Sequence, residues 1–357
     1  MHNQQKPTYY HDYLKLESLL NSQEMISKKN NIEAPDEMLF IITHQAYELW
    51  FKQMLHELHQ VKATLSLPSL DDSSLAEITW KVERVNKIVE LLISQIPILE
   101  TMTPMDFLEF RDLLIPASGF QSVQFREIEI LLGVNQSQRP DVKVYNFMGR
   151  LSKEHQSHLE KLSKEASISA LVNNWLERIP YLKTDGFDFW KEYQNSVDKM
   201  FKRDEEIIKS NLTLGDEERK GQLINLEKTK ETFHQFFDSS KNENSIFSAK
   251  SRRSALFILL YRQRPLFIRP FQFLQSLIDL DEKLTHWRQR HAELARRMLG
   301  TKIGTGGSSG HKYLKATAER NRVFNEISNL TTFLIPKSGL PKLPQNLKNE
   351  LDYYFNG

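Results

Sequence analysis

The chain contains no cysteine, and this absence removes several kinds of chemistry at once. Disulfide bonds, thiolate metal sites and a thiolate-ligated haem are all excluded. If the protein binds iron, histidine is the natural axial ligand, and methionine and tyrosine are weaker candidates. The 11 histidines are therefore the main candidates for a metal ligand.

A strong net charge of either sign is also missing. The 48 Lys and Arg residues exceed the 46 Asp and Glu residues by two, so no overall field favours nucleic acid or an anionic membrane. Basic clusters at 250–253 and 288–297 are typical of solvated helix faces, and no groove-reading or base-stacking module accompanies them. We therefore expect no nucleic-acid partner.

Long apolar runs are absent as well. No stretch approaches the roughly 18 apolar residues that cross a bilayer, and the N-terminus lacks the apolar core of a secretion signal. The hydrophobic fraction of 39% is ordinary for a globular protein. We expect a soluble, cytoplasmic protein with no membrane partner.

The sequence has few alternating Val, Ile and Thr runs, whereas Leu, Glu, Lys and Gln recur with a period near 3.6 residues. This pattern predicts an all-α fold. The expected helices cover Tyr10 to Leu20, Asp36 (as N-cap) to Leu65, Ser74 to Gln95, Thr103 to Ile115, Asp216 to Phe237 and Asp279 to Leu299. In the second helix, the expected core residues are Leu39, Ile42, Tyr47, Trp50, Met54, Leu58 and Val61. The start of the fourth helix, Thr103-Pro104-Met105-Asp106, resembles a capping box.

The middle of the chain differs in composition from its ends. Residues 135–254 are more polar, contain Pro, Asn and Asp breaks, and include the low-complexity run 238–245. Apolar density returns at 255–261. We predict that 135–254 form an inserted helical subdomain with a loose tether, and that 1–134 and 255–357 form the main helical domain.

A glycine-rich stretch, Gly304-Thr-Gly-Gly-Ser-Ser-Gly310, follows the last long helix. Five of the thirteen glycines lie between Gly300 and Gly310, and residues without a Cβ let backbone amides approach a bound group closely. The stretch matches neither a P-loop nor a dinucleotide-binding fingerprint. It predicts a ligand-binding loop of another kind.

Two histidines lie on apolar faces of different predicted helices. His291 shares one face with Leu284, Trp287, Leu294 and Met298, and His44 follows Phe40 by four residues. Either histidine alone is more often a core residue bonded to a neighbouring carbonyl. Together they also fit a cofactor bound between two helices, one histidine being a ligand and the other lying opposite.

Arg111 follows Phe107 by four residues on an otherwise apolar turn. Its guanidinium stays charged, so burial requires a carboxylate or phosphate partner. Glu109 and Asp112 are too close in sequence to be expected on its side of the helix. An internal ion pair and a ligand carboxylate bound by the guanidinium are equally compatible with the sequence. The small polar turn after Pro116 adds the hydroxyl of Ser118, and Tyr10, Tyr13 and Phe125 offer aromatic walls.

Five ordered blocks make the chain resemble the tryptophan 2,3-dioxygenase family. The blocks are Tyr10-x-x-Tyr13-Leu14, 36–52 (DEMLFIITHQAYELWFK), 110–122 (FRDLLIPASGFQS), Trp287-Arg-x-Arg-His291 and 304–310. The likeness runs from Tyr10 to beyond Leu334, and the polar middle resembles the longer forms of the family. The resemblance implies an α-helical haem-binding bundle of the tryptophan and indoleamine dioxygenase type, assembled as a homotetramer, a dimer of dimers. It also implies that O2 cleaves the indole C2–C3 bond of L-tryptophan to give N-formylkynurenine.

The resemblance further implies roles for individual residues. His291 matches the ligand of the haem b iron, and His44 matches the catalytic histidine that faces the indole N–H. Phe40 would stack on the indole, Arg111 would bind the carboxylate, and Thr305 would meet the ammonium group. Other implied substrate contacts are Ile41, Ile42, Thr43, Phe107, Leu114 and Ser118, and other haem contacts are Phe125, Ser118 and Gly304. Tyr10 and Tyr13 match residues that reach the active site of a neighbouring subunit.

Two positions depart from the family pattern. His11 replaces a small residue between the two tyrosines, and Pro35 replaces a common histidine before Asp36. Both bear on substrate range more than on the type of reaction. A related haem enzyme that oxygenates a modified indole, and a non-catalytic haem-binding protein, remain as alternatives.

Overall fold

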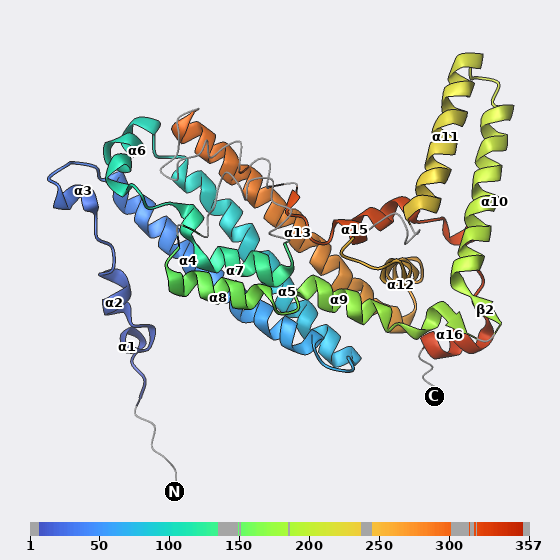
Figure 1. Cartoon of the computed structure of the whole chain (residues 1–357), viewed down its shortest axis with the longest axis horizontal. Coiled ribbons are helices and arrows are strands. Elements are labelled where there is room, and N and C mark those ends of the chain that lie inside the picture. The colour runs from blue at the N-terminus through green and yellow to red at the C-terminus, as the bar shows by residue number, and fades with distance from the viewer. Residues whose placement is uncertain are drawn as a thin grey trace, which may run out of the picture.

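The computed structural model describes residues 7–134, 149, 151–184, 186–236, 245–300, 314, 318 and 320–352. Three long helices form its central bundle: α4 (Asp36–Leu65), α5 (Asp72–Leu99) and α13 (Pro265–Leu299) (Figure 1). Both α4 and α13 pack along α5. The fully buried residues between them include Met54, Leu58, Val61, Ile78, Val82, Val89, Leu274, Leu277 and Leu280. The all-α prediction is confirmed.

The long helices begin and end close to their predicted limits, with exceptions at their N-termini. The N-cap of α4 is Pro35, so Asp36 is the first helical residue and not the cap. The N-cap of α5 is Asp71, whose carboxylate accepts the Ser74 backbone N–H at 2.7 Å. Helix α13 already begins at Pro265 and not at Asp279, because proline is favoured in a first turn.

The predicted capping box is confirmed at the start of α6 (Pro104–Arg111). The Thr103 hydroxyl accepts the Asp106 N–H at 3.2 Å, and the Asp106 carboxylate accepts the Thr103 N–H at 3.1 Å. The α-helix ends at Arg111 instead of Ile115, and a 3₁₀ turn, η1 (Asp112–Leu114), follows it. Arg111 is therefore the last residue before the α-helix changes to a 3₁₀ helix.

The N-terminal arm is broken where one helix was expected. It comprises α1 (Tyr10–Leu14), α2 (Leu16–Leu20) and α3 (Ile26–Lys29). Between α1 and α2, the backbone of Lys15 adopts the left-handed conformation, with φ 54°. A left-handed residue cannot continue an α-helix, so the single-helix prediction is wrong. The arm extends away from the bundle (Figure 1).

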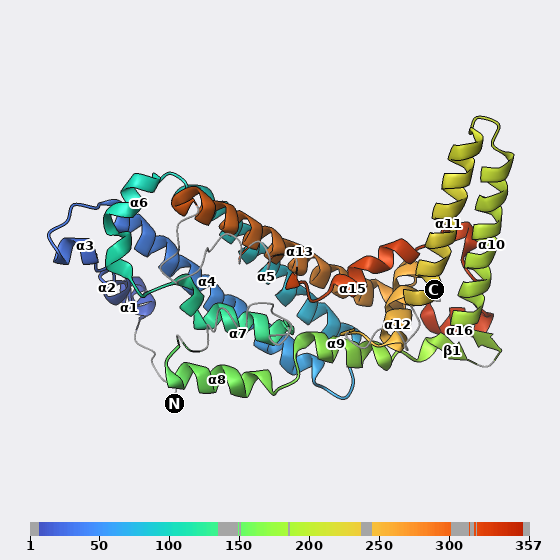
Figure 2. The ribbon, with the colours of Figure 1, turned by 45° about the horizontal axis from the view of Figure 1, so that its top comes forward.

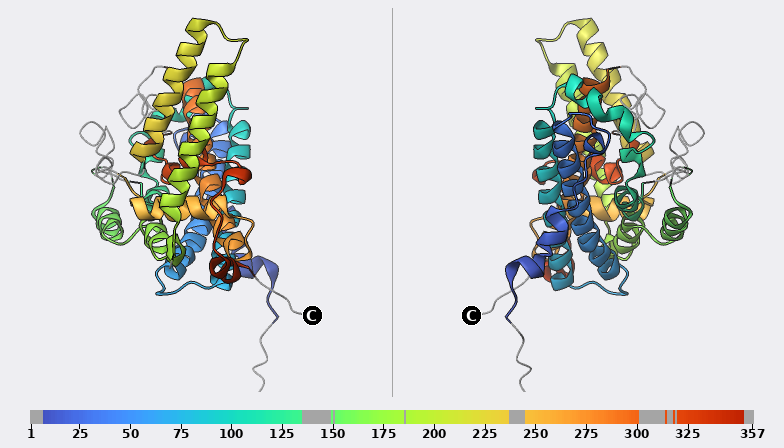
Figure 3. Two further views of the ribbon diagram at one scale, coloured as in Figure 1. Left: turned by 90° about the vertical axis from the view of Figure 1, so that its right-hand side faces the viewer. Right: turned by 90° about the vertical axis from the view of Figure 1, so that its left-hand side faces the viewer.

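The remaining helices surround the bundle. Seen along its long axis, α8 (Lys153–Ser163) and α9 (Ile168–Glu177) lie on the opposite side of α4 from α5 (Figure 3). The hairpin of α10 (Phe189–Ser210) and α11 (Asp216–Phe236) projects from the end opposite the arm (Figure 2). The other elements are η2 (Gly119–Gln121), α7 (Val123–Leu132), η5 (Pro180–Leu182), α12 (Ala249–Leu260), α15 (Asn325–Ser328), η7 (Asn329–Phe333), η8 (Lys337–Gly339), α16 (Gln345–Leu351) and the antiparallel strands β1 (Lys183–Thr184) and β2 (Phe187–Asp188).

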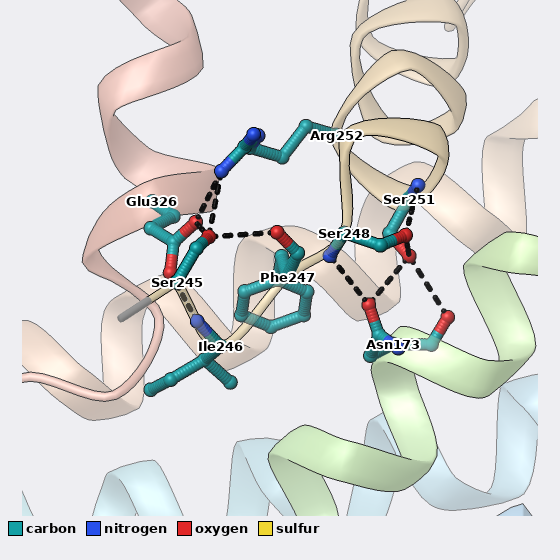
Figure 4. Close-up of polar contacts among 8 residues, drawn as sticks. All are labelled: Asn173, Ser245, Ile246, Phe247, Ser248, Ser251, Arg252 and Glu326. Carbon is teal, nitrogen blue, oxygen red and sulfur yellow. Dashed lines mark hydrogen bonds and ion pairs between the residues drawn. The ribbon is translucent and has the colours of Figure 1, made fainter. Parts of the chain in front are cut away.

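A network of hydrogen bonds joins α9, α12 and α15 where the chain returns to the bundle (Figure 4). The Ser248 N–H and the Ser251 hydroxyl donate to the Asn173 side chain, at 2.9 and 2.6 Å. Ser245 and Arg252 both donate to the Glu326 carboxylate, the Arg252 bond being 3.0 Å. These contacts fix the start of α12.

The division of the chain at 135 and 254 stays a prediction.

Gly133 ends α7 in a conformation that favours glycine, with φ 111°. A Cβ at this position would lie 2.1 Å from the Ser169 Oγ and 2.8 Å from the Ser167 Oγ. We expect Gly133→Ala to lower the free energy of unfolding by about 2 kcal/mol or more, measured by urea denaturation. Gly119→Ala, where a Cβ would meet nothing within 4 Å, is the matched control. Equal stability of the two variants would contradict the steric argument.

The helices in the described part of the chain can be compared with the demands of a membrane span. None of its helices combines the length and the apolar character that crossing a bilayer demands.

Candidate active site

The first part of the site is an aromatic cluster between α4 and α6. The Phe40 ring lies 4.1 Å from the His44 ring, 5.8 Å from the Phe107 ring and 5.6 Å from the Phe110 ring, between centroids. Phe40 and His44 are four residues apart on α4, so they share one face. The structure therefore brings three predicted site residues, Phe40, His44 and Phe107, into contact.

The hydrogen bond of His44 defines which of its nitrogens is available. Its Nδ1 lies 2.7 Å from the Phe40 carbonyl oxygen, which can only accept, so Nδ1 carries the proton. Burial lowers the pKa of His44, and the Phe40 bond and the Glu48 charge oppose this shift only in part. The ring is neutral at pH 7, and the Nε2 lone pair is left to accept a hydrogen bond.

The second part of the site surrounds His291 on α13. The His291 ring stacks on Trp287 at 5.4 Å, and Trp287 also contacts Phe125 at 5.0 Å and Tyr47 and Phe51 of α4 at 6.1 and 6.2 Å. These aromatic contacts connect the histidine-bearing parts of the two helices.

Burial lowers the pKa of His291 to about 4, and repulsion from His44, which acts when both rings are protonated, adds to the shift. The imidazole is therefore neutral at pH 7. Among the described residues, none forms a hydrogen bond with either of its ring nitrogens. His291, whose side chain is partly exposed, thus differs from a core histidine whose ring bonds to a neighbouring carbonyl.

Arg111 lies at the junction of α6 and η1 with 13% of its side chain exposed. Its Nη1 contacts the Asp112 carboxylate at 3.2 Å, so the expectation that Asp112 would face elsewhere is wrong. The 3₁₀ turn that begins at Asp112 changes the direction of that side chain. Asp112 is 79% exposed, and an exposed ion pair contributes little energy. Arg111 is therefore suited to exchange this contact for a ligand carboxylate.

The other predicted site residues fall into four groups. Leu114 and Phe125 pack against the main core, Thr43 is buried, and Ile41 is partly buried. Ser118 caps η2, its hydroxyl accepting the Phe120 N–H at 3.4 Å. Ile42 is 49% exposed, so its predicted place in the core is wrong. Tyr10 and Tyr13 are 70% and 72% exposed, and among the described residues their rings stack on no predicted site residue. Gly304 and Thr305 lie outside the described residues.

A buried ionic network next to the site was not predicted. The Glu129 carboxylate accepts from Arg126 at 2.7 Å, from Arg288 at 3.3 Å and from the Asn321 amide at 3.1 Å. Both guanidiniums also lie near the face of Phe125, at 6.0 and 5.8 Å. The Arg126 and Glu129 spacing of three residues was a local signal, whereas the other two partners are distant in sequence. Glu129 thereby connects α7 to the helix that carries His291.

Together the fold and the site define an α-helical protein with two neutral histidines, on different long helices, set among aromatic rings. This arrangement is typical of helical proteins that bind a cofactor between helices. A model of the family described as tryptophan 2,3-dioxygenase matches residues 1–334. The chain belongs to this family.

Curated relatives match the chain over nearly its full length. The tryptophan 2,3-dioxygenase of Alteromonas mediterranea is 45% identical over 98% of this chain and 98% of its own length. That of Bdellovibrio bacteriovorus is 43% identical over 98% and 99%. That of Dictyostelium discoideum is 42% identical over 98% and 89%.

Proposed function

We propose that the chain is a haem-dependent dioxygenase that cleaves the indole C2–C3 bond of L-tryptophan to give N-formylkynurenine. Both atoms of O2 enter the product. The observation that carries the proposal is the pair of neutral imidazoles on α4 and α13, one of them without a hydrogen-bond partner in the described chain. Family membership and the Phe40, His44 and Arg111 geometry support it.

The residues fit a haem b group bound through His291. A neutral imidazole is the form that ligates iron, and its low pKa keeps His291 in this form over the physiological range. No described residue is hydrogen-bonded to either ring nitrogen of His291, so one is available as a ligand. When bound, the haem iron would supply the site at which O2 is activated.

The substrate end of the site belongs to α4 and α6. Phe40 offers an aromatic face for the indole ring, and the His44 Nε2 accepts a hydrogen bond from the indole N–H. Arg111 binds the substrate carboxylate with two parallel N–H donors. Holding the substrate at both ends fixes the C2–C3 bond in place, which contributes several kcal/mol, on the order of 7 if alignment is tight.

We also propose a homotetramer, arranged as a dimer of dimers. The arm exposes seven large apolar side chains: Tyr9, Tyr10, Tyr13, Leu14, Leu19, Leu20 and Ile26. Such a group is unusual on a free surface and suits burial against a second copy of the chain.

A cytoplasmic location stays a prediction, which fractionation of the producing cells would check.

The direct test supplies haem-loaded, reduced protein with L-tryptophan and ¹⁸O-labelled O2. We expect a Soret band that shifts when L-tryptophan is added, and N-formylkynurenine that contains two labelled oxygen atoms. A product with one labelled atom would favour the related monooxygenating enzyme. Haem binding without turnover would favour the non-catalytic alternative, and a preparation that takes up no haemin would overturn the proposal.

Arg111→Ala tests the carboxylate-binding role. Two charge-assisted hydrogen bonds would be lost, so we expect the KM for L-tryptophan to rise about 100-fold or more. Tryptamine lacks the carboxylate, so wild type and variant should turn it over with similar kcat/KM. Asp112→Asn removes the exposed partner and serves as the control, with an expected change below about threefold. A similar loss with tryptamine would assign Arg111 to the fold instead.

A further inference from the structure

The Glu37 carboxylate lies in the first turn of α4 and binds the start of α3. Its Oε1 accepts the Ile26 N–H and its Oε2 accepts the Ser27 N–H, both at 2.8 Å. The residue is only 1% exposed. Both oxygens are thus committed to the two backbone donors that begin α3, which have no partner within that helix.

The position of Glu37 relates this contact to the substrate site. Glu37 precedes Phe40 by three residues and His44 by seven, so all three lie along one face of α4. Helix α3 also contacts η1, the turn that begins immediately after Arg111. In the ribbon, α3 lies at the end of the bundle where α4 begins, near α6 (Figure 2). Glu37 thereby connects α4 to the segment that packs beside the Arg111 turn.

A second contact supports the same placement. The Gln23 amide donates to the Gln45 side-chain oxygen at 2.7 Å, so the chain just before α3 is bound one residue beyond His44. This bond joins neutral, partly exposed groups, whereas Glu37 contributes a buried charge with both oxygens bonded. Charge-assisted hydrogen bonds are the stronger kind, so Glu37 is the main anchor of α3.

We propose that Glu37 is a positioning residue for the dioxygenase reaction: it fixes α3 against η1 and so maintains the amino-acid end of the substrate site. This inference rests on the proposed function. Glu37 touches neither substrate nor haem in this scheme, and it acts through α3 and the Arg111 turn. Its loss therefore weakens the binding of L-tryptophan and leaves haem binding and the chemical step unchanged.

The main variant is Glu37→Gln. Glutamine keeps one acceptor oxygen but places an NH₂ group against a backbone N–H, so one hydrogen bond is lost and two donors face each other. Glu33→Gln is the matched control, because it also removes one negative charge but lies exposed, without a recorded hydrogen bond to the described residues. Ile26→Pro removes the N–H that Oε1 accepts and leaves the carboxylate intact, and proline is tolerated at a first helical position.

Haem-loaded, full-length variants are compared in steady-state turnover of L-tryptophan, in the Soret shift on titration with L-tryptophan, and in tryptic cleavage after Lys28 and Lys29. For Glu37→Gln and Ile26→Pro we expect the KM and the midpoint of the Soret titration to rise about tenfold. The kcat should stay within about twofold, the haem content should be normal, and cleavage should be faster. Glu33→Gln should behave as the wild type does.

An unchanged KM in a Glu37→Gln variant that folds would overturn the inference, whether or not cleavage becomes faster. A fall in kcat or haem content without a change in KM would show a purely structural role and would also overturn it. If Glu37→Gln does not fold, Ile26→Pro decides by the same criteria. A wild-type protein that does not turn over L-tryptophan would instead show that the proposed function has failed.

Discussion

His291→Ala is expected to abolish the normal haem spectrum and, with it, the turnover of L-tryptophan. His291 is the neutral, partly exposed imidazole that no described residue hydrogen-bonds, so its removal takes away the proposed axial ligand. Absorption spectra of the purified variant, before and after addition of haemin, measure the loss. Added imidazole should restore part of the Soret band, because a small ligand can replace the deleted ring.

His44→Ala separates the ligand role from the substrate role. His44 belongs to the Phe40 cluster on α4, and its free Nε2 orients the indole N–H in the proposed scheme. We expect normal haem content and a turnover lowered by about ten- to a hundredfold. This decrease corresponds to the free energy of one or two hydrogen bonds to the substrate. Equal loss of haem in His291→Ala and His44→Ala would contradict the proposal that His291 binds the haem iron and that His44 contacts the substrate.

The fold was predictable where local signals decide the structure. Helical periodicity located α4, α5, α11 and α13, and the Thr103 and Asp106 spacing located the start of α6. The predictions failed where backbone conformation or tertiary contact decides. The sequence around Lys15 does not indicate that this residue adopts a left-handed conformation. The exposure of Ile42 depends on which other elements pack against α4.

The site was predictable in part for a similar reason. The four-residue spacing of Phe40 and His44, and of Phe107 and Arg111, places each pair on one helical face, so half of the geometry is local. The contact between Phe40 and Phe107, and the anchoring of α3 by Glu37, join separate elements, and periodicity within one helix does not reveal them. The choice that spacing alone left open, between a core histidine and a ligand, was made from blocks shared with a known family, and the ligand role of His291 stays a prediction.

The largest effect on stability is expected from Glu129→Gln. The Glu129 carboxylate is buried between Arg126 and Arg288, and glutamine would remove the negative charge that both buried guanidiniums contact. Breaking a buried ion pair by removing one partner typically costs about 3–5 kcal/mol, and we expect a loss of this size in the free energy of unfolding. Urea denaturation followed by circular dichroism measures it.

Glu90→Gln is the matched control for this prediction. Glu90 also contacts two cations, Lys87 at 2.9 Å and Lys283 at 3.1 Å, but its side chain is 41% exposed. Water screens exposed charges, so this variant should lose less than about 1 kcal/mol. Each of the two carboxylates contacts two cations among the described residues, so the difference between the variants chiefly reports on burial. If Glu129→Gln unfolds at the same urea concentration as Glu90→Gln, the carboxylate does not compensate the two buried guanidiniums. The connection from α7 to the His291 helix would then depend chiefly on the packing of Phe125 against Trp287 and Arg288.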